Sequence, residues 1–149
     1  MKSDDFVELY VTRWGQVKDI FDAIPFPKMS FGEYHHFNTA RGFAVTFFEP
    51  KIQRCNVLFA EKILDEGKAK IDAIIRHEFG HVVDFLLSPG EVDLIAGRAG
   101  YLLPKTAERR ADAIAYVIWR QIIFYDKETL VQTLDAHHAY PVRPVHLGL

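Results

Sequence analysis

The sequence predicts an α+β fold, with a small three-stranded, mainly antiparallel sheet packed on three helices in a single compact domain, residues 1–149. The segment 29–60 is rich in β-branched and aromatic residues and is interrupted by turn residues, which is typical of short strands. Three other segments place apolar residues at helical spacing. These are 3–23, 68–87 and 104–125. The tail, 139–149, carries two prolines and is expected to be irregular.

Composition and charge are those of a globular protein with one hydrophobic core. Of the 149 residues, 49% are hydrophobic and 26% are charged. The net charge of −2 and the scattered basic residues predict no nucleic-acid-binding surface. No apolar run is long enough for a membrane span and no signal-peptide pattern is visible, which predicts a cytoplasmic protein. Cys55 is the only cysteine and is expected to be a core residue. The oligomeric state stays open.

The first helix is predicted over 3–23. Ser3 can cap its start, and Pro25 and Pro27 end it. Its apolar stripe is expected to cover one face of the sheet. The stripe comprises Phe6, Val7, Tyr10, Val11, Trp14, Val17 and Phe21.

Three strands are predicted next, over 31–37, 43–49 and 54–60. The first is weak, and Pro50 ends the second. His35 and His36 are adjacent, so they would face opposite sides of a strand, and we expect both to be surface residues.

The helix predicted over 68–87 has no proline and one internal glycine, Gly80. Its apolar residues cover most of the helical circumference, which indicates a buried helix. His77, His81 and Asp84 share the remaining edge and are expected to face the interior or a cleft. The apolar residues are Ile71, Ile74, Ile75, Phe79, Val82, Phe85 and Leu86.

Residues 77–81 read His-Glu-Phe-Gly-His. Two histidines four residues apart on a helix can bind one zinc ion, with Glu78 beside the metal to handle protons. The alternative is two ordinary histidines that hydrogen-bond to backbone carbonyls. Asp84 could serve as a ligand, but the rise from His77 to Asp84 is about 10 Å, which favours a structural or supporting role for Asp84.

Catalytic zinc usually has three protein ligands and an open position for water. Glu108 and Asp112 are four residues apart on the next predicted helix and so share a face. Glu108 could be the third ligand, and Asp112 could hold the ring N–H of a metal-bound histidine. The alternative is a solvated acidic face near a helix start, although this helix is apolar nearly all round.

His-Glu-x-x-His followed by Glu-x-x-Ala-Asp on a later helix resembles the gluzincin zinc peptidases, and the small size is similar to that of minigluzincins. The resemblance covers about 56–125 and implies a zincin-like fold. It implies that one Zn²⁺ per chain is bound by His77, His81 and Glu108, with Glu78 as general base and Asp112 supporting a ligand. It also implies that the strand before the helix of 68–87 is the sheet edge that holds an extended substrate. The candidate substrate-binding residues are Asn56, Val57, Leu58, Phe59 and Ala60.

Further helices are predicted from the capping box at 88–91 to about 99 and over 127–137. A tyrosine or histidine commonly stabilises the oxyanion in such enzymes. Tyr101 is preferred because it precedes Glu108 in a predicted loop, with core packing as the equal alternative. The other candidates are Tyr116, His137 and His138.

Two functions are compatible with these features. The first is a zinc-dependent metalloendopeptidase that hydrolyses a peptide or protein substrate by means of a metal-activated water. The second is a zinc-binding regulatory or protein-interaction module on the same scaffold, inactive or latent. A purely structural zinc is disfavoured, because such sites usually use four Cys or His ligands.

Overall fold

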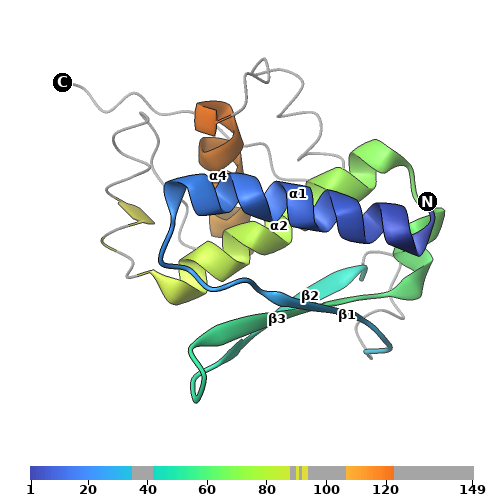
Figure 1. Cartoon of the computed structure of the whole chain (residues 1–149), viewed down its shortest axis with the longest axis horizontal. Coiled ribbons are helices and arrows are strands. Elements are labelled where there is room, and N and C mark those ends of the chain that lie inside the picture. The colour runs from blue at the N-terminus through green and yellow to red at the C-terminus, as the bar shows by residue number, and fades with distance from the viewer. Residues whose placement is uncertain (35–41, 88–89, 91, 94–106, 123–149) are drawn as a thin grey trace.

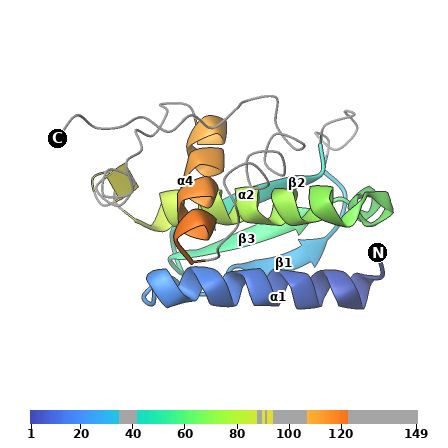
Figure 2. The ribbon, with the colours of Figure 1, turned by 90° about the horizontal axis from the view of Figure 1, so that it is seen from above.

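The computed structural model describes residues 1–34, 42–87, 90, 92–93 and 107–122. Within these ranges the chain is a small α+β protein (Figure 1). Helices α1 and α2 cover one face of a three-stranded sheet, and α4 crosses α2 (Figure 2). The elements are α1 (Ser3–Ile20), β1 (Lys28–Phe31), β2 (Ala44–Glu49), β3 (Arg54–Phe59), the 3₁₀ helix η2 (Glu61–Asp65), α2 (Lys68–Leu86) and α4 (Ala107–Ile122).

The sheet has the order β1-β3-β2 and is mixed. β3 pairs in parallel with β1 and antiparallel with β2, so that Val57 lies opposite both Met29 and Thr46. The prediction of a mainly antiparallel sheet is therefore confirmed only in part, since the pairing of β1 with β3 is parallel. The predicted first strand, 31–37, is also misplaced, since β1 spans Lys28–Phe31. β1 is only four residues long, so its alternation of polar and apolar residues is a weak signal. Its pairing with β3 joins distant parts of the chain, and local sequence patterns do not predict it.

α1 packs on the sheet and on α2 through aromatic residues. The ring centroids of Phe6 and Phe59 are 4.8 Å apart, and Tyr10 lies at the same distance from Phe79. The Tyr10 hydroxyl donates a hydrogen bond to the carbonyl oxygen of Pro27, 2.7 Å away. Lys2, not Ser3, occupies the N-cap position, and no side chain caps the helix. The helix ends at Ile20, three residues earlier than predicted.

α2 agrees closely with its prediction, and every residue from 71 to 83 is buried. The buried set includes an acidic and a basic residue, Asp72 and Arg76. Asp72 accepts hydrogen bonds from Arg76 and from Arg13 on α1, whose Nε lies 2.8 Å from Oδ1. Burial alone would raise the pKa of Asp72, but the hydrogen bonds and charges of the two guanidinium groups lower it below 3.8. This ion-pair network fixes α1 against α2.

α2 and α4 cross at Gly80, where the two backbones are in close contact. A Cβ atom on Gly80 would overlap the carbonyl oxygen of Ala111 and lie 2.8 Å from its carbonyl carbon. One turn away, Arg110 of α4 forms an ion pair with Asp84 of α2, with Nη2 2.8 Å from Oδ1. These two contacts determine where the first turn of α4 lies relative to α2.

Some predictions fall on residues that the structure does not describe. The helices predicted after α2 and over 127–137 lie mostly or wholly outside the described ranges, as does the tail 139–149. Among the helices that are described, none combines the length and the apolar character that crossing a lipid bilayer requires.

Candidate metal centre

His77 and His81 are carried on successive turns of α2 and are both buried. Their ring centroids are 4.7 Å apart and the rings are nearly perpendicular, with an interplanar angle of 87°. Burying the polar nitrogens of a histidine ring is unfavourable unless a polar group hydrogen-bonds to them. The polar group that meets both rings comes from α4.

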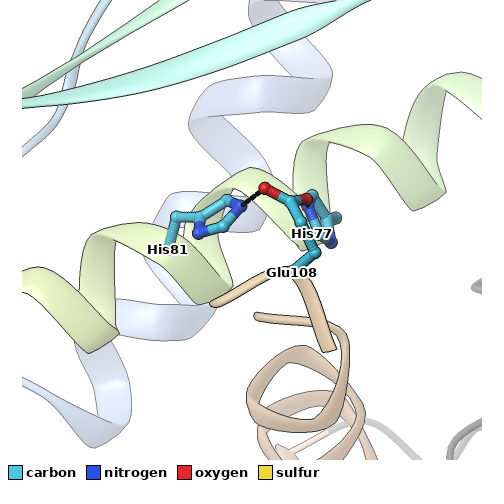
Figure 3. Close-up of side chains that lie close together, drawn as sticks. All are labelled: His77, His81 and Glu108. Carbon is cyan, nitrogen blue, oxygen red and sulfur yellow. Dashed lines mark hydrogen bonds and ion pairs between the residues drawn. The ribbon is translucent and has the colours of Figure 1, made fainter. Parts of the chain in front are cut away.

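Glu108, in the first turn of α4, bridges the two histidines (Figure 3). Its Oε2 lies 2.9 Å from His77 Nε2, and its Oε1 lies 3.2 Å from His81 Nε2. One ligand atom from each of the three residues lies within 4.8 Å of the others. The side chain of Glu108 is 57% exposed, so the cluster opens toward solvent on this side. These three residues can hold a metal ion.

The donor set fits zinc. Two imidazole nitrogens and one carboxylate oxygen are typical ligands of a catalytic zinc ion, which keeps a fourth position for water. Asp112 supports this arrangement from the second turn of α4, because its buried Oδ1 lies 2.7 Å from His77 Nδ1. A neutral His77 would donate its Nδ1–H to Asp112, and its Nε2 lone pair would then point toward Glu108. The predicted contact between Asp112 and a ligand histidine is thus present.

When no metal is bound, His77 carries a proton that the neighbouring carboxylates stabilise. Burial lowers the pKa of His77, but hydrogen bonds with Asp112 and Glu108 outweigh burial and raise this pKa to about 10. Hydrogen bonds with His77 and His81 hold the pKa of Glu108 well below its usual range. Burial raises the pKa of Asp112, despite its bond with His77. The Nε2 proton of the charged His77 faces Glu108, so metal binding must displace it, while the Nδ1–H stays on Asp112.

Glu78 lies in the same pocket, between the histidines and the sheet. The pocket has a volume of about 260 Å³ and is lined by all three candidate ligands, by Glu78 and by residues 44–46 of β2. Glu78 is 3% exposed, and its Oε2 accepts a hydrogen bond of 2.6 Å from Thr46 Oγ1. Glu78, the predicted general base, therefore lies beside the candidate metal ligands, and Thr46 of the sheet hydrogen-bonds to its carboxylate.

Asp84 is not part of the cluster of candidate ligands and instead forms an ion pair with α4. Its carboxylate pairs with Arg110, with Oδ1 2.8 Å from Nη2 and 3.2 Å from Nε. The hydrogen bonds that Arg110 donates to Asp84 raise the pKa of this guanidinium group, although burial alone would lower it. Asp84 thus joins α2 to α4 through Arg110, which stands two residues after Glu108 in the chain.

The predicted substrate-binding residues do not form an edge. Asn56, Val57, Leu58 and Phe59 belong to β3, which lies between β1 and β2 and is hydrogen-bonded on both sides. Ala60, just beyond β3, is buried and donates its N–H to the carbonyl oxygen of Phe43. The prediction of an open edge at Asn56–Ala60 is therefore wrong. The strand of the described sheet that lies next to the metal-binding cluster is β2.

Tyr101, the preferred oxyanion donor, lies outside the described residues, as do His137 and His138. Tyr116 is described and is buried in the hydrophobic core on α4. Burial raises the pKa of its hydroxyl. The role of Tyr101 stays a prediction.

Two site residues cannot be identified from the sequence. Thr46 gives no local signal, because a threonine in a strand is expected for its β-propensity alone. Phe85 has the spacing of an ordinary apolar helix residue, yet it is 47% exposed and lines the pocket. Its ring stacks with those of His81 and Phe48, with centroids 6.1 Å and 6.2 Å away. Both residues become part of the site through the packing of β2 on α2.

Comparisons with protein-family models, with curated proteins and with solved structures gave no match to this chain. Its function is therefore inferred from the arrangement of its own side chains.

Proposed function

We propose that this chain is a zinc-dependent metallopeptidase of the gluzincin type. The observation that carries the proposal is the meeting of four side chains in one pocket. His77, His81 and Glu108 place ligand atoms within 4.8 Å of one another, and Glu78 lines the same pocket from the turn between the histidines. Metal ligands alone would fit several functions, whereas a carboxylate beside them fits hydrolysis.

Zinc is the metal that the ligand set favours. Imidazole suits several transition metals, while magnesium and calcium prefer oxygen ligands. Two histidines with one carboxylate, together with an exposed side at Glu108, leave a coordination position open. Cys55 is buried in the hydrophobic core, which is consistent with an all-nitrogen and oxygen ligand set.

The proposed reaction divides the work between the metal and Glu78. Bound zinc would supply a Lewis acid that activates water and polarises the scissile carbonyl group. Glu78 would take a proton from the attacking water and deliver it to the leaving amine, so that the peptide bond is hydrolysed without net proton transfer to the enzyme. A positioned general acid–base of this kind contributes about 10²- to 10⁴-fold to the rate.

The proposed substrate is an extended peptide bound along β2. β2 is an edge strand of the described sheet, and its residues 44–46 line the pocket beside Glu78. Backbone pairing with an edge strand gives affinity for many sequences. Phe85 adds an apolar wall, which favours an apolar side chain next to the scissile bond.

The experiment measures metal content and cleavage on the same protein. Wild type and Glu61→Ala, an exposed control on η2, are expected to bind one zinc per chain, and Glu108→Ala much less. Zinc-loaded wild type is expected to cleave peptides from a denatured protein mixture, with products identified by mass spectrometry. Glu78→Gln should keep its zinc and lose cleavage. Zinc binding with no cleavage of any peptide would favour the regulatory module instead, and equal zinc affinity in Glu108→Ala would remove the third ligand.

A further inference from the structure

We propose that Thr46 is a positioning residue, whose hydroxyl group holds the Glu78 carboxylate in the orientation that proton transfer requires. This inference rests on the proposed function, in which Glu78 acts as the general base. The contact that carries it joins Thr46 Oγ1 to Glu78 Oε2 at 2.6 Å. It links a residue 32 positions earlier in the chain to the centre of the metal-binding helix.

The sheet fixes the position of the hydroxyl group. Thr46 lies opposite Val57, and Phe48 opposite Cys55, both of which are fully buried residues of the central strand. Thr46 and Phe48 therefore lie on the face of β2 that meets α2, since side chains two apart on a strand share a face. Phe48 makes the second contact with α2 by stacking on Phe85. Two contacts on one face hold Thr46 in register with Glu78.

The chemistry fixes the direction of the hydrogen bond. An ionised carboxylate only accepts hydrogen bonds, so the single hydroxyl hydrogen of Thr46 is donated to Glu78. The bond uses Oε2, which leaves Oε1 as the oxygen that would receive a proton from water. Threonine is branched at Cβ and has few accessible rotamers in a strand, so the donor is rigid. A buried carboxylate without this donor could rotate, and a displacement of about 1 Å at a catalytic group can cost about 10²-fold in rate.

Two substitutions at Thr46 distinguish the effect of its hydrogen bond from the effect of its packing. Thr46→Val keeps the branched shape and removes the donor, while Thr46→Ser keeps the donor and removes a methyl group. Thr12→Val, on the exposed side of α1, is the matched control for replacing a hydroxyl with a methyl group. All variants are assayed as zinc-loaded full-length protein, with zinc content measured on each sample.

We expect Thr46→Val to lower kcat by about 10- to 100-fold, the effect of losing a hydrogen bond to a charged group. KM should stay within about twofold and zinc should stay at one per chain. Thr46→Ser should recover most of the kcat, and Thr12→Val should match wild type. An unchanged kcat in Thr46→Val, or a Thr46→Ser variant as slow as Thr46→Val, would overturn the proposal.

A second measurement separates this proposal from the proposed function. Urea unfolding of wild type, Thr46→Val, Glu78→Gln and the double variant forms a double-mutant cycle that needs no activity. Non-additive effects are expected, and strict additivity would show that the two side chains do not interact in solution, which also overturns the proposal. If wild type binds zinc and cleaves no peptide, the proposed function fails whatever the cycle shows.

Discussion

Gly80 of α2 lies directly against Ala111 of α4, so closely that a Cβ atom on Gly80 would overlap the Ala111 carbonyl oxygen. Gly80 stands between the two candidate histidine ligands, and Ala111 stands between Glu108 and Asp112. The two helix backbones are therefore in close contact beside the candidate ligands. Small residues on both sides allow the α4 carboxylates to reach the imidazole rings of α2.

The first prediction concerns this crossing. Gly80→Ala should destabilise the protein by at least about 1–3 kcal/mol, because the added methyl group meets backbone and not a flexible side chain. Zinc affinity should fall as well, since α4 must move away from the histidines. Chemical denaturation and zinc titration measure the two effects. Gly15→Ala, in open space on α1, is the control and should stabilise by up to about 1 kcal/mol.

The second prediction concerns Asp112. Asp112→Asn keeps the size of the side chain and removes the charge that holds Nδ1 of His77, 2.7 Å away. Zinc affinity should fall by about 10- to 100-fold, the usual effect of losing a carboxylate behind a histidine ligand. Competition with a chromogenic chelator measures the affinity. Asp19→Asn, an exposed residue on α1, should leave it unchanged. Equal affinities for wild type and Asp112→Asn would contradict the assigned role of Asp112.

The third prediction is that zinc binding releases a proton near pH 7. The pKa of His77 is raised from 6.5 to about 10, so the free protein carries this proton and metal binding must remove it. Calorimetric titrations in buffers of different ionisation enthalpy measure the number of protons released, with about one expected from His77. Zinc affinity should rise with pH over this range. Binding enthalpies that do not depend on the buffer would contradict a proton on His77 Nε2 in the metal-free protein.

The same shift has a consequence for the stability of the metal-free protein. Because the folded-state pKa of His77 lies above its unfolded value of 6.5, its contribution is fully present below pH 6.5 and is lost as the pH rises through about 10. Urea unfolding of chelator-treated protein across this range should show the decline. His77→Gln, which removes the titrating group, should flatten it.

The fourth prediction concerns the ion-pair network between α1 and α2. Asp72→Asn removes the carboxylate that pairs with the buried guanidinium of Arg76 and should cost about 3–5 kcal/mol. Arg13→Gln removes the more exposed partner and should cost less. Because the folded-state pKa of Asp72 is below 3.8, its contribution is present above pH 3.8 and is lost as the pH falls through the folded value. Wild type and Asp72→Asn should thus converge in strong acid.

The sequence predicts best what depends on short-range spacing. The four-residue intervals of His77 to His81 and of Glu108 to Asp112 are each about one turn of helix, so each pair shares a face wherever its helix packs. The apolar circumference of 68–87 likewise predicts a buried helix, with few errors at its ends. A metal-binding cluster assembled from two helices is predictable because each half is local.

The sequence predicts least what depends on strand pairing. Residues 54–60 have strong strand character, and that same apolar character is what places β3 in the middle of the sheet and away from its edge. The direction of β1 and the contact of Thr46 with Glu78 arise from pairings between residues about 30 positions apart. Alternation along one strand reports which face is buried but not which neighbour lies beside it.

The candidate ligands belong to two helices and lie 27 residues apart along the chain, from His81 to Glu108. An ion bound by both helices would act as a removable cross-link that stabilises the folded chain, because it binds the folded state and not the unfolded one. Its effect would grow with supply, reaching about 2.7 kcal/mol when the free ion is at a hundred times its dissociation constant. Metal availability would then govern the lifetime of the protein as well as its chemistry.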